Sequence, residues 1–515
     1  MRWSKIIVSI FLIIVVGILF FLQYKFKSSV INAIDNGVPS NIELKYAQIN
    51  ANVFSGNVEL DSFSAKLLNL DSNVISTLNT NKLKVTGFSL WQFIFNKTIS
   101  IDNIIFNNPN LHYYQNQQEQ HRPKDSTANK KFEKVITIAK FSIVNGSFKI
   151  NGNKEDSLLV SMDSIYLTLN GISTNAEKLK QKIPFDYQDY QLKAKQLFFN
   201  MNEYETLKIE NLAIENNKLN LANLFIKPKF TKEELSAKIA VERDYIQLHI
   251  PELTLGEFDF GFNNDKFYVA SETSKIIKPN LIIYRDKRVA DDKSIKKMYS
   301  KILRDLSFDL AISTLKIKQG YINYAERVEN TNESGKIFFK NINANLTNLS
   351  NSYKKGEKTK ISINSHFMGK APMNLDISFD VNNKQDNFLV SGQFKNFNAK
   401  IANTFFESNL NAKAEGEIEQ IFFTFDGNNF NSKGDLKMKY KEFKFEILNR
   451  KNEVNKLFTA IGNLFINDGS KSDKDGYRHG KIAVERDKTK SFFNYLWINV
   501  EDGLKSALTG KGEKE

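Results

Sequence analysis

The 515-residue sequence contains no cysteine, and this absence excludes several kinds of chemistry at once. Disulfide bridges, thiolate metal sites and cysteine nucleophiles all require a thiol. Proline and glycine are also scarce, at 8 and 24 residues, which argues against a collagen-like or low-complexity chain. Hydrophobic residues make up 41% of the chain and include 42 phenylalanines, too rich a composition for a disordered protein.

The sequence also lacks the short motifs that carry most enzyme chemistry. No G-x-S-x-G, H-E-x-x-H, Walker A or dinucleotide-binding pattern occurs. The five histidines are scattered along the chain, and no two have the spacing of a pair of metal ligands: His112, His121, His249, His366 and His479. The sequence therefore predicts a protein that is not an enzyme, with no catalytic residues, no metal site and no cofactor.

Positive charge exceeds negative charge, with 72 Lys and Arg against 58 Asp and Glu and a formal net charge of +14. The lysines are spread along the chain rather than clustered. This pattern favours a role in keeping strand edges soluble over attraction to anionic lipid head groups, although both interpretations are open. No basic patch indicates a nucleic-acid partner.

An uncharged apolar run from Ile6 to Leu22 stands near the N-terminus. Seventeen residues in a helix span about 26 Å, close to the hydrocarbon thickness of a bilayer. A cleaved signal peptide is the alternative, but the run is long for a signal core and no A-x-A-like site follows it. We expect a membrane anchor at 6–24, with residues 1–5 in the cytoplasm and the rest outside it.

Beyond the anchor, short segments with apolar residues at every second position recur almost to the C-terminus, as in Leu375–Phe379. Such alternation is typical of strands with one apolar face. Because no strand–helix–strand alternation is visible, we expect a mainly β fold with an antiparallel sheet.

A few amphipathic helices are expected among the strands. Helical spacing of apolar residues predicts helices at Ser294–Leu306, Glu453–Phe465 and Phe493–Leu508. In the last of these, the predicted apolar stripe consists of Phe493, Leu496, Trp497, Val500 and Leu504. Phe88–Phe95 is expected to form one or two helical turns.

One pattern occurs four times without gaps: apolar-x-x-apolar-x-apolar-x-x-turn-x-apolar-x-apolar. The copies begin at Ile101, Ile138, Ile209 and Ile312, and their turn positions are Pro109, Gly146, Asn217 and Gly320. Asn145-Gly146 fits a two-residue hairpin, whereas Pro109 fits that turn poorly, so a bulge within one continuing strand is equally open. Either geometry keeps the apolar residues on a common face.

The sequence resembles the AsmA-like superfamily of bacterial envelope proteins, the AsmA/TamB type. The resemblance rests on an N-terminal anchor followed by strands at 42–67, on Phe88-Ser89-Leu90-Trp91 leading into Ile99–Leu111, and on a closing segment that runs from Phe492 to Lys505. It implies an elongated, curled antiparallel β-groove with an apolar lining. It also implies acyl-chain binding and a place at the inner membrane, with the bulk of the chain in the periplasm of a Gram-negative bacterium.

Under this interpretation, residues 25–450 form the periplasmic groove and residues 451–515 a C-terminal AsmA-like segment, whose last helix caps the groove or contacts the outer membrane or envelope proteins. The expected partner is a phospholipid or other envelope lipid. The alternative is an envelope scaffold with a closed β core that carries no lipid. The candidate lining residues are Ile104, Phe106, Leu111, Phe141, Ile143, Phe148, Ile150, Leu212, Ile214, Leu315, Ile317 and Ile322.

Overall fold

A computed structural model describes residues 20–21, 23–32, 38–96, 98–115, 135–152, 157–329, 333–354, 356–448 and 472–509. Most of these residues lie in strands, and the 23 strands found among them belong to one mixed sheet. The mainly β fold is therefore confirmed. The chain divides into two compact units, which we describe separately: unit 1 runs to Met201 and includes Leu207–Asn216, and unit 2 comprises Asn202–Thr206 and the chain from Asn217 onward.

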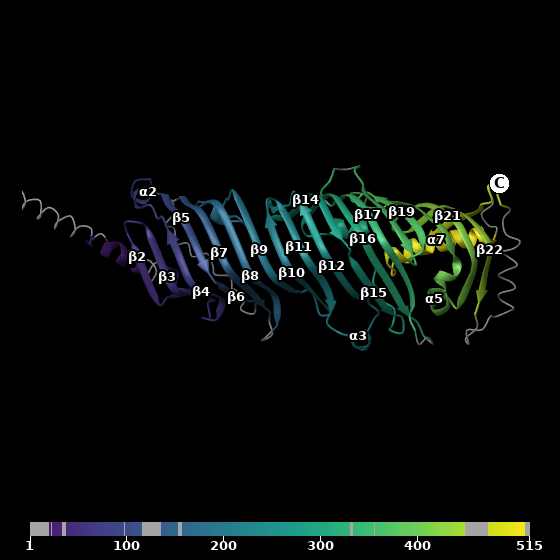
Figure 1. The fold of residues 1–515 in the computed structure, drawn as a ribbon, viewed down its shortest axis with the longest axis horizontal. Helices are drawn as coiled ribbons and strands as arrows, with labels where there is room; N and C mark the ends of the chain where they lie inside the picture. The colour runs from purple at the N-terminus through teal and green to yellow at the C-terminus, as the bar shows by residue number, and fades with distance from the viewer. Residues whose placement is uncertain are drawn as a thin grey trace, which may run out of the picture. The chain divides into compact units, whose positions relative to one another are not determined.

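Unit 1 consists of strands that lie side by side (Figure 1), and apolar and polar residues alternate along much of their sequence. Its elements are β1 (Ile42–Lys45), β2 (Gln48–Asn52), β3 (Asn57–Leu68), β4 (Val74–Thr86), α2 (Leu90–Phe95), β5 (Thr98–Asn107), β6 (Asn110–Tyr114), β7 (Val135–Asn151), β8 (Leu158–Thr174), a 3-10 turn (Lys178–Lys180), β9 (Asp189–Asn200) and most of β10 (Glu205–Glu215). The short helix α2 confirms the helical turns expected at Phe88–Phe95.

Unit 2 continues the pattern and ends in a long helix. Its elements are β11 (Lys218–Pro228), α3 (Lys232–Lys238), β12 (Tyr245–Gly256), β13 (Asp259–Asn263), β14 (Lys266–Ile277), β15 (Asn280–Asp286), α4 (Tyr299–Arg304), β16 (Asp309–Arg327), β17 (Gly335–Ser350), β18 (Thr359–Phe367), β19 (Ala371–Phe379), β20 (Phe388–Asn398), the short helical turns Ala399–Ala402, α5 (Asn403–Phe405) and Phe406–Leu410, β21 (Ala412–Gly427), β22 (Asn431–Ile447), β23 (Arg478–Glu485) and α7 (Phe492–Thr509).

The expectation of a purely antiparallel sheet is wrong, because each unit contains parallel pairings. In unit 1, β5 and β6 both pair antiparallel with β4 and parallel with β7. In unit 2, β14 and β15 pair in the same way with β12 and β16. A parallel neighbour requires a crossover of a dozen or more residues. Residues 287–308 supply that crossover in unit 2, and their single short helix, α4, leaves little helical periodicity in the sequence.

The two parallel pairings are local copies of one another, down to single hydrogen bonds. Next to Pro109, the Asn108 N–H donates to the Val144 carbonyl, and the Ser147 N–H donates to the Pro109 carbonyl, both at 2.8 Å. Next to Pro279, the Lys278 N–H donates to the Lys318 carbonyl, and the Tyr321 N–H donates to the Pro279 carbonyl, again at 2.8 Å. Each proline therefore marks a break in one continuing strand and not a reversal of the chain.

The turn position of the repeated sequence pattern adopts two different structures. In β7, Asn145 has φ 54° and the pairing with β8 shifts register on both sides of Gly146, so Asn145-Gly146 forms a bulge and the hairpin alternative is wrong there. In the third copy, Asn216 and Asn217 are the only residues between β10 and β11, and both have positive φ, at 51° and 54°. Two consecutive positive φ values are the backbone signature of a two-residue turn.

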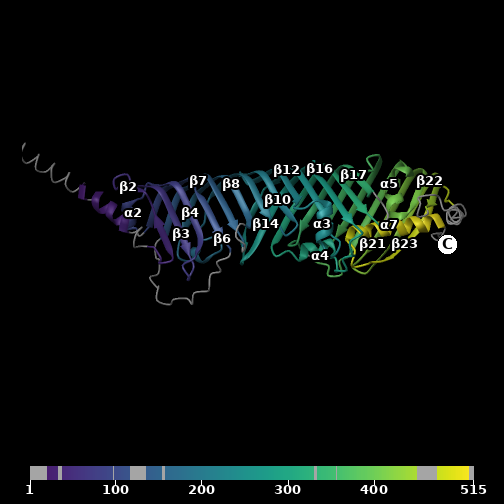
Figure 2. The same cartoon turned by 90° about the horizontal axis from the view of Figure 1, so that it is seen from below.

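The largest buried cluster lies at the C-terminal end of unit 2, where α7 packs on the sheet (Figure 2). The predicted helix at Phe493–Leu508 is confirmed by α7. Leu496, Val500 and Leu504 of the predicted stripe pack against the buried cluster, but the fully buried positions lie one residue earlier. The buried residues are Phe492, Tyr495, Asn499, Gly503 and Ala507. A Cβ at Gly503 would lie 2.8 Å from Leu436 Cβ and 2.9 Å from Ile482 Cγ1, so the close approach of the helix to the sheet favours glycine at this position.

The other expected helices have different outcomes. Only Tyr299–Arg304 of the predicted Ser294–Leu306 helix is helical, because the Lys296 N–H donates to the Lys488 carbonyl at 2.8 Å and this stretch pairs with another segment. The predicted helix at Glu453–Phe465 lies outside the described residues, as does most of the expected anchor at 6–24. Within the described part of the chain, no helix is both long and apolar enough to cross a membrane.

Candidate functional site

The register of unit 1 brings seven of the twelve candidate lining residues onto one face of the sheet. Side chains that lie opposite one another in paired strands point to the same face. Phe106 pairs with Ile143, which pairs with Leu167, and Ile104 pairs with Phe141, which pairs with Leu169. These rows continue to Leu83 and Val85 of β4 and to Leu192 and Tyr190 of β9. The result is an apolar ladder across β4, β5, β7, β8 and β9.

The ladder continues beyond the bulge. Leu111 pairs with Leu78 and with Phe148, Phe148 pairs with Met162, and Ile150 pairs with Tyr113 and Val160. A Cβ at Gly146 would meet both Ile143 Cγ2 and Ile165 Cβ, so position 146 faces the same side as its neighbours in the ladder. The three-residue step across the bulge thus returns the next apolar residue to the same face.

These side chains remain partly open to solvent. Leu111 is exposed at 37%, and the other six candidates of the unit 1 ladder are half-buried. Of the twelve candidate residues, none belongs to the buried clusters found among the described residues. The ring centroids of Phe106 and Phe141 lie 5.8 Å apart, so adjacent strands present their rings as a continuous apolar surface. We call this surface, from β4 to β9, the open ladder.

Three further candidates, Leu315, Ile317 and Ile322, lie on β16 of unit 2 and are half-buried. Ile317 pairs with Ile276 and Ala344, and Ile322 pairs with Leu281 and Phe339. Leu315 pairs with Leu346, but its partner on β14 is Ser274, which is buried and polar. This part of the face is therefore less uniformly apolar than the open ladder.

The last two candidates, Leu212 and Ile214, lie on β10. They alternate on one side of their strand, and Ile214 is only 7% exposed, the one candidate that is buried.

The opposite face of unit 1 carries many polar side chains. Next to the ladder residues, Ser142 pairs with Thr168, and Thr168 pairs with Gln191. Farther along, Lys84 Nζ lies 3.0 Å from Glu59 Oε1, and this hydrogen bond lowers the pKa of the Glu59 carboxyl from its ordinary value. Strands with one apolar and one polar face explain the period-two alternation of the sequence, and they place these lysines away from the ladder.

Two hollows of the described surface lie elsewhere. One of about 290 Å³ is lined mainly by Lys, Asn and Ser side chains around Asn345 and Ser362, and one of about 820 Å³ is lined mainly by polar residues near Asp380 and Asn431. Only one candidate, Ile317, lines either of them. Within the described residues, no group of three or more His, Cys, Asp or Glu side chains could hold a metal ion.

At the C-terminal end of unit 2 the same kind of ladder is covered by α7. Phe394 pairs with Ile421, which pairs with Met438, and both Ile421 and Met438 are at most 5% exposed beneath the helix. The side chains of α7 also close the free edge of β23: the Lys481 N–H donates to Ser506 Oγ, and the Ala483 N–H to Asp502 Oδ2, both at 2.9 Å. We call this region the capped end.

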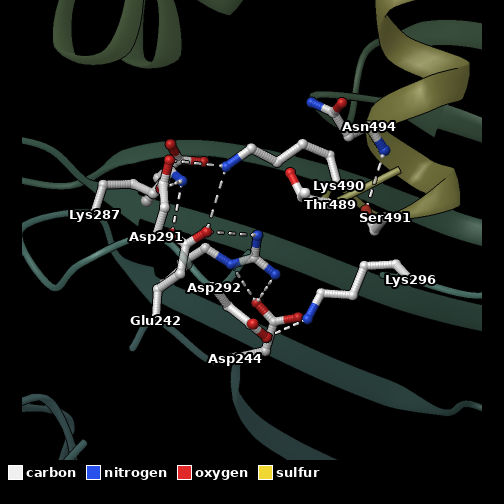
Figure 3. Close-up of polar contacts among 12 residues, drawn as sticks. Glu242, Asp244, Lys287, Asp291, Asp292, Lys296, Thr489, Lys490, Ser491 and Asn494 are labelled. Carbon is white, nitrogen blue, oxygen red and sulfur yellow. Dashed lines mark hydrogen bonds and ion pairs between the residues drawn. The ribbon is translucent and has the colours of Figure 1, made fainter. Parts of the chain in front are cut away.

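An ion cluster around the buried carboxylate of Glu242 holds the start of α7 in place (Figure 3). The Glu242 side chain is 4% exposed, and its Oε2 lies 2.6 Å from Lys287 Nζ. Lys490, just before the helix, reaches Asp291 at 3.2 Å and Glu242 at 3.7 Å. The hydrogen bonds from Lys287 and Lys490 lower the pKa of the Asp291 carboxyl from its ordinary value.

Several ladder residues are not apparent from the repeated pattern. Leu83, Leu167 and Leu192 complete the rows of the open ladder, although their strands carry no copy of the pattern. A missed copy surrounds Pro279, where Ser271 and Ser274 replace the first two apolar positions. The proline at the expected turn position was the signal for it.

The sequence was compared with protein-family models and with curated proteins. No protein-family model matches the sequence, and no curated protein matches it with significance.

Proposed function

We propose that the protein binds the acyl chains of envelope lipids along the open ladder. It would act as an AsmA-like, inner-membrane-anchored periplasmic protein that supports phospholipid transfer or outer-membrane assembly. The observation that carries this proposal is the ladder itself, an apolar surface that crosses five strands and remains partly open to solvent. Such a surface, when it is large and rimmed by polar residues, marks an interaction site.

The chemistry of the ladder suits a lipid chain. Its Phe, Ile and Leu side chains offer no hydrogen-bonding groups, so an acyl chain can slide along them without breaking specific bonds. Each methylene moved out of water contributes about 0.8 kcal/mol. The head group can stay in water beyond the rim, which explains how one surface can accept several kinds of envelope lipid.

The N-terminal end of unit 1 supports a link to a membrane. Residues 23–32 are helical, and Val30 and Ile31 pack against the cluster of Ile49, Leu60 and Phe63. The Gln23 side chain accepts a hydrogen bond from the Val53 N–H at 2.8 Å. A helix that continues the expected anchor therefore ends on the first strands, beside the start of the apolar face.

The second candidate function, a scaffold with a closed β core that carries no lipid, is favoured only by the capped end. There, α7 buries the apolar face as an ordinary core, with Phe425, Leu436 and Met438 each 1% exposed. A closed core along the whole sheet would require similar cover over the open ladder.

The proposal is tested by photo-crosslinking at Phe148. A photoreactive residue at this position, in the full chain in native membranes, should capture lipid that mass spectrometry can identify. Phe148→Asp should reduce lipid co-purification at least about tenfold, because a carboxylate on the apolar face must be desolvated when a chain binds.

The matched control is Val144, on the same strand but the opposite face, where it pairs with Asn107 and is 39% exposed. A photoreactive residue at 144 should not capture lipid, and Val144→Asp should leave co-purification unchanged. Equal capture at both positions, or a protein that purifies free of lipid with no crosslink at 148, would refute acyl-chain binding and favour the scaffold.

A further inference from the structure

The crossover segment 287–308 carries an apolar patch that no other part of the described chain covers. Ile295 is 74% exposed, the highest value among the large apolar side chains described. On α4, Tyr299 and Ile302 are 43% and 47% exposed, and Phe493 on α7 is 46% exposed. We call these residues, together with Phe430 at 59%, the crossover patch.

The patch is one surface made from three segments of unit 2. The Tyr299 ring contacts the ring of Phe492, next to Phe493, with centroids 4.8 Å apart. The Lys488 ammonium lies 3.7 Å above the Phe430 ring, and the Lys488 carbonyl accepts the Lys296 N–H. In Figure 2, α4 lies beside the start of α7.

These exposed apolar side chains are not needed for the packing of the buried core. On the other side of the same segment, Met298 is 2% exposed in the main buried cluster, and Leu303 packs against that cluster. The segment thus satisfies its own packing with one side and presents Ile295, Tyr299 and Ile302 on the other.

The segment is also held rigidly. The Arg486 guanidinium donates to the Lys296 carbonyl at 2.7 Å, and the Arg304 guanidinium donates to the Val381 carbonyl at 2.6 Å and to Asp386 at 2.8 Å. The Ser300 hydroxyl donates to the same buried carboxylate at 2.8 Å. A partner therefore meets a surface that is already ordered, and little conformational entropy is lost on binding.

The uncompensated charge beside the patch is positive. Six of the seven Lys and Arg in residues 287–308 form ion pairs with carboxylates of this segment or with Glu242, Asp286 and Asp386. Lys293, two residues before Ile295, is exposed, and within the described chain neither Lys293 nor Lys488 forms an ion pair with a carboxylate. Exposed apolar side chains beside such lysines fit a surface with an apolar interior and an anionic exterior.

We propose that the crossover patch docks on the surface of a membrane that contains anionic phospholipid. Ile295, Ile302 and Phe493 enter the boundary between head groups and acyl chains, while Lys293 and Lys488 contact the phosphates. This contact is separate from the expected N-terminal anchor and from acyl-chain binding on the open ladder.

The test uses the full chain held in phosphatidylcholine nanodiscs, so that the N-terminal apolar run is already inserted in a bilayer and cannot bind the added vesicles. Nanodiscs are mixed with vesicles of phosphatidylcholine, with or without about 30% phosphatidylglycerol, and recruitment is measured by flotation. We expect recruitment to the anionic vesicles only. Ile295→Ser/Ile302→Ser should weaken it about tenfold or more by removing buried apolar area. Lys293→Gln/Lys488→Gln should weaken it about tenfold, and high salt should mimic that change.

Two controls distinguish membrane docking by the crossover patch from nonspecific hydrophobic binding and from acyl-chain binding on the open ladder. Leu389→Ser/Leu410→Ser removes two side chains of unit 2 that are 46% and 44% exposed elsewhere, and it should leave recruitment unchanged. Phe148→Asp should lose lipid capture but keep recruitment. Equal recruitment to neutral vesicles, no recruitment at all, or patch variants that behave as wild type would overturn the proposal. If polyglutamate retains the wild type but neither kind of vesicle recruits it, the proposal is overturned and the partner is an acidic protein.

Discussion

The open ladder and the capped end are built from the same kind of strand, yet their apolar side chains have different surroundings. In the open ladder, Phe106 pairs with Ile143 and Ile143 with Leu167, and all three are half-buried. In the capped end, Phe423 pairs with Leu436, and these two are 5% and 1% exposed. The difference is α7, which covers the second region. An alternating strand prepares an apolar face, but another element decides whether that face becomes a core.

The largest expected effect compares the same truncation in the two regions. Leu436→Ala should lower the free energy of unfolding by about 3 kcal/mol, because it leaves a cavity beneath α7. Leu167→Ala should cost less, about 1 kcal/mol, because the Leu167 side chain is only half-buried and its surroundings can relax. Hydrogen exchange of the β22 and β8 amides measures both values. Equal losses would mean that the open ladder is covered as closely as the capped end.

A smaller effect is expected at the point where α7 approaches the sheet most closely. Gly503→Ala places a methyl group less than 3 Å from Leu436 and Ile482, which should cost about 1–3 kcal/mol. The gain in helix propensity, about 1 kcal/mol, offsets only part of this cost. With Trp3 and Trp91 replaced by Phe, the fluorescence of Trp497 on α7 reports urea unfolding of the capped end.

Lys505→Ala is the control for Gly503→Ala, because Lys505 lies on the outer side of the same helix and its ammonium pairs with Glu501 at 2.5 Å on that helix. It should shift the urea midpoint little. A Gly503→Ala protein as stable as wild type would show that α7 is not seated on β22 and β23 as described.

The smallest effect concerns pH and the ion cluster before α7. The pKa of Asp291 is lowered in the folded protein by hydrogen bonds from Lys287 and Lys490. A carboxyl group whose pKa is lower in the folded than in the unfolded protein stabilises the fold at pH values above its ordinary pKa. This stabilisation is lost as the pH falls through the pKa of the folded state. Below a pH of about 4, amides in the first turn of α7 should therefore lose protection against exchange, measured relative to their intrinsic exchange rate at the same pH.

Asp291→Asn should show this weaker protection at pH 6 already and lose the acid dependence that this group contributes. Glu252→Gln, an exposed acid on β12 with no ion pair in the described chain, is the matched control and should change neither. Identical exchange in wild type and Asp291→Asn at pH 6 would remove Asp291 from the contacts that hold α7.

Much of the open ladder could be predicted because side-chain direction in a strand follows sequence position. Ile104 and Phe106 lie two residues apart, as do Phe141 and Ile143, so the common face of each pair is a local property of its strand. The structure adds that these residues also lie in register across strands. The candidates Leu212 and Ile214 were found by the same rule.

What could not be predicted depends on partners that lie far away in sequence. The pattern around Gly146 is compatible with a hairpin or a bulge, and pairing with Pro109 and Ile165 selects the bulge. The parallel pairing of β14 with β16 rests on a crossover with one short helix. The fully buried positions of α7 lie one residue earlier than the predicted stripe because Gly503 and Ala507, which have little apolar surface of their own, permit close contact with Leu436 and Ile482.

By itself, the sequence determined the β class, the alternation of apolar and polar residues, the existence of α7 and the apolar candidates on each strand. These are consequences of local stereochemistry and of the periods of helix and strand. Only the tertiary structure decided which strands are parallel, which apolar face is covered and which stays open, and how residues 287–308 expose Ile295. Those outcomes depend on contacts between distant segments, whose free energies a local pattern does not contain.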